Sequence, residues 1–147
     1  MSLSQIYGAF LLRSSFPARS DKIPAPPHTL SRFQYITKIR GVSQNIETSI
    51  HFCPGFVVGK IPEAFADGTI AFVLGCLCSQ SSGDYSIEAM QMFPFGKGDS
   101  IENHPLPRVT IVGHVIQCPI TLKHRGVGFP VNALTYIRDK FKHTTFM

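Results

Sequence analysis

The stretch PRVTIVGHVIQC, residues 107–118, decides the fold class, because a single glycine divides two β-branched runs, VTIV and VI. β-Branched residues favour extended strands, whereas a glycine inside a strand packs poorly and loses backbone entropy. A glycine at such a position is typical of a β-bulge, a sharp bend or a close approach of another backbone. The stretch TIAFVLGCLCS, residues 69–79, repeats the pattern around Gly75. We therefore expect strands that bend at Gly75 and Gly113 around a small β-barrel.

The composition also favours a β-rich protein. A chain of 147 residues with 44% hydrophobic residues is long enough for one ordinary domain with a core. Twelve Phe, twelve Gly and eleven Pro combine aromatic strand formers with frequent turn residues. We expect residues 31–147 to form a single domain. Residues 1–30 are expected to be an N-terminal tail or linker, either disordered or packed on the domain, because three closely spaced prolines follow Lys22.

Alternation of apolar and polar residues predicts a series of strands separated by Gly/Pro turns. A helix competes with the strand for residues 86–92, and one helical turn is expected within residues 60–68. Residues 138–147 are expected to be a short basic tail or a short helix. The segment at 69–80 is apolar on both faces, which is typical of a central strand. The predicted strands lie within residues 32–42, 48–59, 69–80, 85–95, 108–118 and 129–137.

Charge is distributed unevenly along the chain, whose net charge is +5. Residues 1–60 and 108–147 are each net basic, whereas residues 61–107 are net acidic. If the two basic ends fold together, one side of the protein attracts phosphates. The alternative is a solvated surface on which the charges cluster without a binding role.

The four cysteines, Cys53, Cys76, Cys78 and Cys118, lack zinc-finger spacing and a disulfide framework. We expect free cysteines, with Cys76 and Cys78 on the core face of one strand, and no metal site. An intracellular location in the nucleus or cytoplasm is therefore expected. The acid-free first twenty residues also fit a mitochondrial transit peptide. The apolar run IYGAFLL is too short to span a membrane, so no membrane association is predicted.

No sequence motif for catalysis or cofactor binding is evident. The chain lacks a P-loop, GxGxxG, HExxH or GxSxG motif, so neither a cofactor nor an enzymatic activity is predicted. Cys53 or Cys118 could still meet a distant histidine in the folded chain to form a nucleophile pair. Nothing in the sequence selects such a pair.

The stretches GTIAFVLGCLCS, YSIEAMQMFPF, PRVTIVGHVIQ and GFPVNALTYI together resemble the strand set of OB-fold domains. The resemblance covers residues 65–138 and is closest from Val109 to Val115; small, largely uncharacterised fungal proteins with OB-like strands are also similar. It implies an all-β fold, a small Greek-key, OB-like β-barrel with extra N-terminal strands and little helix. The usual helix between the third and fourth strands is not evident. Residues 31–59 are either early barrel strands or an added sheet.

This resemblance implies binding of single-stranded nucleic acid, with DNA favoured over RNA, because OB domains stack bases on aromatic side chains while cations follow the backbone. Phe33 and Tyr35 are expected in the core. The alternative function is a protein-interaction or assembly subunit that forms homo-oligomers or binds a protein partner. The residues predicted to bind nucleic acid are Arg32, Lys38, Arg40, Lys97, Lys123, His124, Arg125, Tyr136, Arg138 and Lys140.

Overall fold

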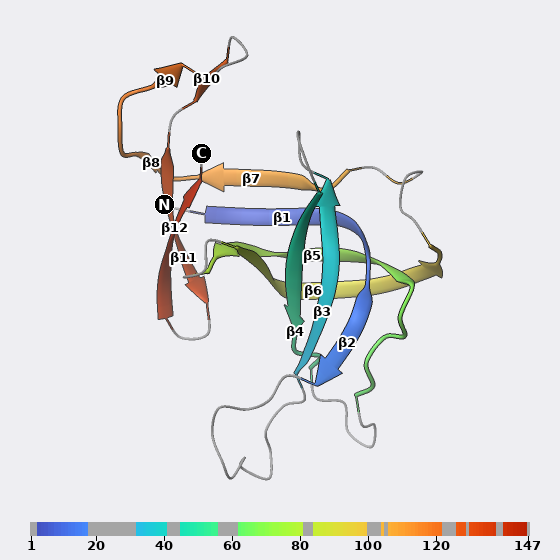
Figure 1. The fold of residues 1–147 in the computed structure, drawn as a ribbon. Coiled ribbons are helices and arrows are strands. Elements are labelled where there is room, and N and C mark those ends of the chain that lie inside the picture. Colours follow the sequence, from blue (N-terminus) through green and yellow to red (C-terminus); the bar gives the residue numbers. More distant parts are fainter. Residues whose placement is uncertain are drawn as a thin grey trace.

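The protein is all-β in the part of the chain that the structure, a computed structural model, describes (Figure 1). No helix occurs in these residues, so the predicted small all-β class is confirmed. The described residues are 3–17, 32–40, 45–55, 62–80, 84–99, 104, 106–121, 126–128, 130–137 and 140–146. The strands are β1 (Leu3–Leu11), β2 (Arg13–Pro17), β3 (Phe33–Arg40), β4 (Asn45–Phe52), β5 (Thr69–Ser79), β6 (Tyr85–Lys97), β7 (Arg108–Val112), β8 (His114–Val115), β9 (Ile120–Thr121), β10 (Val127–Gly128), β11 (Val131–Ile137) and β12 (Lys140–Phe146).

The main sheet has seven strands in the order β2-β3-β4-β6-β5-β1-β7. Neighbouring strands are antiparallel except for β4 and β6, which are parallel. In Figure 1, β2, β3 and β4 run across the direction of β1, β5, β6 and β7, so the sheet is strongly bent. Two small sheets accompany it, one of β10-β9 and one of β12-β11-β8.

The segment formed by β1 and β2 contributes to both halves of the main sheet. β1 pairs with β5, and after a single residue the chain continues as β2, which pairs with β3. At the junction, the Leu12 N–H donates to the Thr69 carbonyl at 2.8 Å. Ser14 has a φ of 51°, which is unusual for a residue other than glycine, and its N–H donates to Asp67 Oδ1 at 3.0 Å. The run β3-β4-β6-β5 therefore begins and ends against the same chain segment.

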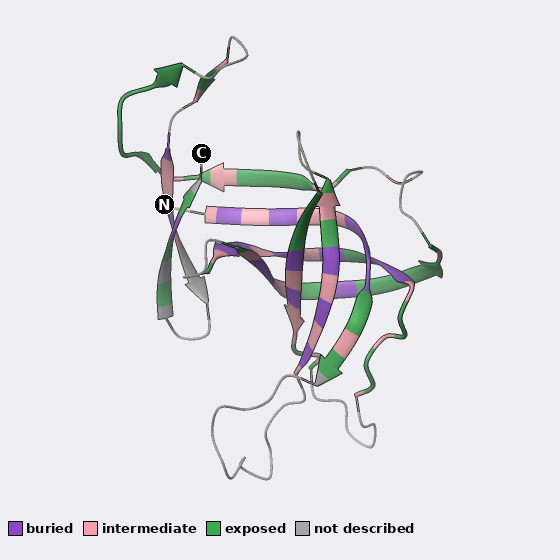
Figure 2. Cartoon of the chain, viewed as in Figure 1, coloured by how far each residue is buried: buried purple, intermediate pink, exposed green. Residues whose placement is uncertain are grey.

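The hydrophobic core follows the alternation of side chains along these strands (Figure 2). Ile6 and Phe10 of β1, Ile50 of β4, Val73 of β5 and Ile87 of β6 are fully buried in one cluster. Successive side chains of a strand point to opposite faces, so each strand contributes every second residue to this core. The burial of Phe33 and Tyr35 in the same cluster agrees with the sequence prediction.

The three-stranded sheet packs against one end of this core. Ala133 of β11 is fully buried within the main cluster. The backbone N–H of Ser79, at the end of β5, donates to the buried Thr144 Oγ1 of β12 at 3.3 Å. Next to it, buried Ser4 donates from its hydroxyl to the Leu77 carbonyl at 2.7 Å. The β11–β12 hairpin therefore covers the end of the sheet where β5 stops and β1 starts.

The two glycines that interrupt apolar strand segments, Gly75 and Gly113, have different roles. Gly75 lies inside β5 where the register with β6 shifts, and a Cβ built there would come within 2.5 Å of the Glu88 carbonyl oxygen. This is the close backbone approach at a bulge that the sequence indicated. Gly113 instead separates β7 from β8, and a Cβ there would clash with the Asn132 carbonyl. The strand that was expected to bend at Gly113 therefore ends there, and the chain passes from the seven-stranded sheet into the three-stranded sheet.

Most predicted strands are observed, and the helical alternatives are wrong in the described residues. Residues 86–92 belong to β6, and residues 62–68 contain a turn at Asp67–Gly68 but no helix. The segment at 138–147, expected to be a tail or short helix, supplies β12 because its backbone pairs with β11 along seven register positions. Cross-strand hydrogen bonding therefore outweighs the helix propensity of these residues.

The main sheet begins earlier in the chain than the boundary expected near Ser31. Residues 3–17, expected to belong to a tail or linker, form β1 and β2, and β1 lies between β5 and β7. Ile6, Phe10 and Leu12 face the core because they lie on one side of an extended chain. The run IYGAFLL is therefore a core strand of the sheet.

Candidate functional site

The predicted cations Lys38 and Arg40 lie at the end of β3 and are exposed. On β4, Glu47 is the register partner of Lys38, and Asn45 is the partner of Arg40. Directly opposite side chains on an antiparallel pair lie about 5 Å apart. Because Glu47 offsets the charge of Lys38, this end of the β3–β4 surface is only moderately basic.

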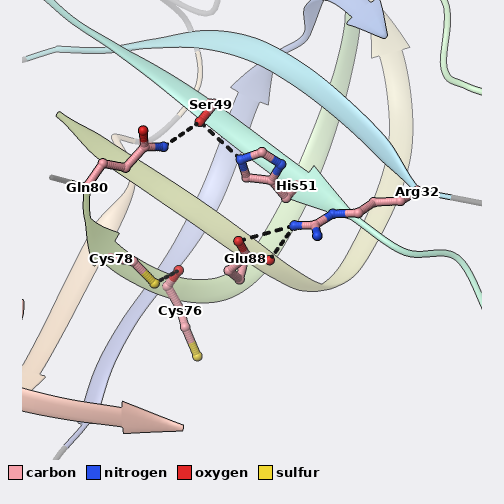
Figure 3. Close-up of polar contacts among 7 residues, drawn as sticks. All are labelled: Arg32, Ser49, His51, Cys76, Cys78, Gln80 and Glu88. Atoms are coloured by element: carbon pink, nitrogen blue, oxygen red, sulfur yellow. Dashed lines mark hydrogen bonds and ion pairs between the residues drawn. The ribbon is translucent and has the colours of Figure 1, made fainter. Parts of the chain in front are cut away.

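Arg32, the first predicted cation, is engaged within the protein. Its Nη2 lies 3.1 Å from Glu88 Oε2 and 3.4 Å from Glu88 Oε1 (Figure 3). The two side chains are only 27% and 17% exposed. Glu88 belongs to β6, so this ion pair ties the start of β3 to a strand beyond β4. Arg32 is therefore a poor candidate for binding a phosphate.

A small polar group lies beside this ion pair on the same side of the sheet (Figure 3). Ser49 Oγ and His51 Nε2 are 3.4 Å apart, and Gln80 Nε2 donates to Ser49 Oγ at 3.4 Å. Both distances are at the long end of the range for hydrogen bonds. These contacts connect β4 with the end of β5, and we assign them a structural role.

Lys97, at the end of β6, lies on an open groove of about 590 Å³. Phe65 in the groove wall is fixed by stacking on Tyr35 and Phe52, with ring centroids 6.0 Å and 6.4 Å away. The Phe65 N–H also donates to the Tyr35 hydroxyl at 3.1 Å. The groove is lined by Glu63, Ala64, Phe65, Ala66, Thr69, Pro94, Gly96 and Lys97.

A surface that the sequence did not predict lies on the outward side of β6, β5, β1 and β7. Phe72 and Phe93 are register partners on β5 and β6, and they are 40% and 56% exposed. Tyr7 of β1 is partly exposed and is the register partner of exposed Arg108 on β7. We call Tyr7, Phe72, Phe93 and Arg108 the aromatic face. Three aromatic rings and a guanidinium group thus share one side of four adjacent strands.

Strict alternation along β6 could not reveal this surface, because it places Phe93 on the side of Ile87 and Ala89. The register shift between Leu74 and Gly75 of β5 leaves an extra residue in β6. Met92 therefore turns inward and is buried, whereas Phe93 turns outward and is exposed. A bulge of one residue reverses the side of the sheet to which each later side chain of the strand points.

The remaining predicted binding residues lie wholly or partly outside the described residues. Lys123, His124, Arg125 and Arg138 are outside them. Tyr136 and Lys140 lie in β11 and β12, but their side chains are also outside the description. The hypothesis that the two basic ends of the chain form one positive side of the protein stays a prediction.

The four cysteines are free. Cys78 is fully buried, as expected of a core position, whereas Cys76 is half-buried. Both lie on the side of β5 opposite Val73 and Leu77. Burial, and secondly the negative charge of Glu88, raise the pKa of the Cys76 thiol. Cys53 and Cys118 are exposed.

No group of three or more His, Cys, Asp or Glu residues in the described ranges could hold a metal ion. No helix in those ranges is long and apolar enough to cross a membrane.

No protein-family model matches the sequence, and no curated protein matches it.

Proposed function

We propose that this protein binds single-stranded nucleic acid without catalysis, through an OB-like β-barrel. The strand connections support the barrel, because the Leu3–Pro17 segment is hydrogen bonded to β5 through β1 and to β3 through β2. The Leu3–Pro17 segment therefore counts as one strand of a five-stranded barrel, and the other four are β3, β4, β6 and β5. Among them β4 and β6 are the parallel pair, and the five can surround one core. A small Greek-key barrel of the OB type requires five strands that enclose one core. In this assignment the barrel occupies residues 3–97, so the strands at 33–52 are barrel strands.

The aromatic face is the observation that carries the proposed function. Solvent-exposed Phe72 and Phe93 stand directly opposite each other, where a nucleobase can stack on either ring. Stacking of one base on an aromatic side chain contributes about 1–3 kcal/mol and requires no particular base. Tyr7 extends this surface toward β7, where Arg108 can contact a phosphate. A single strand that crosses β6, β5 and β1 would meet aromatic rings first and a cation at its end.

Salt dependence of binding tests the proposal. Arg108 lies on the aromatic face and Lys97 lies in the groove, and both cations are exposed. Neutralising two phosphates predicts a roughly sevenfold loss of affinity between about 50 mM and about 200 mM salt, and further cations would steepen it. Fluorescence anisotropy with labelled single-stranded DNA and RNA, and with duplex DNA as the control, measures this loss. Absence of binding to both single strands at the lower salt concentration would overturn the proposal.

A second function, assembly of several copies, is supported by the exposed apolar residues near β7. Val109 and Val112 on β7 are 46% and 45% exposed, and Leu106 just before it is 59% exposed. β7 is the last strand in the order of the main sheet. Exposed strand edges with β-branched residues tend to pair with another chain. Size-exclusion chromatography with light scattering distinguishes a monomer from an oligomer, and a strict monomer argues against this alternative.

A further inference from the structure

The groove beside Lys97 has the construction of a preformed binding site. Phe65 holds its wall in place through the aromatic stack with Tyr35 and Phe52. At the base of the loop, Thr69 donates from its N–H and its hydroxyl to the Ala66 carbonyl, at 3.1 Å and 2.6 Å. These contacts fix the loop at residues 63–66 against β5. A volume of about 590 Å³ is within the usual range for small-ligand sites.

The chemistry of the groove combines an apolar surface with two opposite charges. Phe65, Ala64, Ala66 and Pro94 provide the apolar lining, while Glu63 and Lys97 are exposed in it. Among the described residues, neither Glu63 nor Lys97 takes part in an ion pair. A nucleotide complements this lining, because its base is flat and apolar on its faces, its phosphate is anionic and its base edge donates hydrogen bonds.

The groove lies across β6 from the aromatic face, at the part of β6 that follows its pairing with β4. Phe93 belongs to the aromatic face, and the next residue, Pro94, lines the groove. Neighbouring residues of a strand point to opposite sides, so a bound chain passes from one site to the other around β6. One nucleotide stacked on Phe93 would leave its neighbour close to Pro94 and Lys97.

We infer that the groove binds one guanine nucleotide of the bound single strand, with Lys97 at its phosphate and Glu63 at its base. This inference rests on the proposed function. A carboxylate only accepts hydrogen bonds, and its two oxygens match two adjacent donors. Among the four bases, guanine alone presents two adjacent donors, N1–H and the N2 amino group, on its pairing edge. Glu63 therefore makes the groove selective for guanine.

A single-base series tests the inference. The probes are labelled oligothymidylates of equal length that carry no other base, one central guanine or one central inosine, which lacks the N2 amino group. We expect the guanine probe to bind about tenfold more tightly than oligothymidylate, as for other bidentate base contacts, and inosine to fall in between. One guanine per strand avoids guanine self-association.

Matched variants show which residue contacts the base. Glu63→Gln should remove the guanine preference, so that the guanine probe and oligothymidylate bind equally tightly. Glu47→Gln removes the same charge at an exposed site outside the groove and should preserve the preference. Equal affinities of the wild-type protein for guanine and thymine probes would overturn the inference but leave the proposed function intact. A guanine preference that survives Glu63→Gln also overturns it. Failure of every probe to bind contradicts the proposed function itself.

Discussion

At the residue scale, the backbone contact at Gly75 gives a direct stability prediction. An added Cβ would lie 2.5 Å from the Glu88 carbonyl oxygen and 2.9 Å from Ile87 Cγ2, so Gly75→Ala must displace β6. We expect Gly75→Ala to lower the free energy of unfolding by about 1–3 kcal/mol, the usual cost of overpacking. Urea denaturation measures it. Gly96→Ala is the control, because a Cβ at Gly96 has no neighbour within 4 Å. Equal stability of the two variants would contradict the close approach at the bulge.

The environment of Cys76 predicts its chemical reactivity. Burial and the Glu88 carboxylate raise the pKa of the thiol, so less of it is the nucleophilic thiolate near neutral pH. We expect Cys76 to react with iodoacetamide more slowly than exposed Cys53 and Cys118 at pH 7, and its own rate to increase as the pH rises. Peptide mass spectrometry measures each rate. Glu88→Gln should accelerate the reaction of Cys76 with iodoacetamide. An unchanged rate would rule out the carboxylate as a cause of the slow reaction.

At the element scale, the β1–β2 segment is expected to be essential for folding. Phe10 is fully buried in the main core, whereas Phe16 on β2 is 52% exposed. We therefore expect Phe10→Ala to cost about 3–5 kcal/mol of stability and Phe16→Ala about 1 kcal/mol or less. Thermal and urea unfolding followed by circular dichroism measure both. A small effect of Phe10→Ala would mean that the N-terminal strand is dispensable to the core.

Strand assignment from the sequence succeeded where the alternation is uninterrupted. Phe33, Tyr35 and Thr37 of β3 are buried as their spacing predicts, because a regular strand has a strict period of two. The prediction failed for β1, where the small residues Gly8 and Ala9 weaken the pattern. It failed again for β12, because this strand is stabilised by its pairing with β11. Local sequence propensity does not report such contacts between strands.

At the scale of the whole molecule, the candidate binding residues could be predicted only in part. Lys38 and Arg40 are exposed, as their predicted binding role requires. The sequence could not show that Arg32 pairs with Glu88, because the two residues are brought together only when β3 and β6 join one sheet. Phe72 and Phe93 meet across β5 and β6, and the bulge that turns Phe93 outward depends on the register of two strands.

The affinity of a Phe72→Ala/Phe93→Ala double variant for labelled single-stranded DNA tests the central claim most directly. Both rings are exposed, so the variant should stay folded, and circular dichroism verifies this. Phe16→Ala removes an equally exposed ring from β2 and serves as the control. We predict that the double variant binds at least about fivefold more weakly than the wild type, because stacking of even one base contributes about 1–3 kcal/mol. Equal affinities of the wild type, the control and the folded double variant would contradict the account.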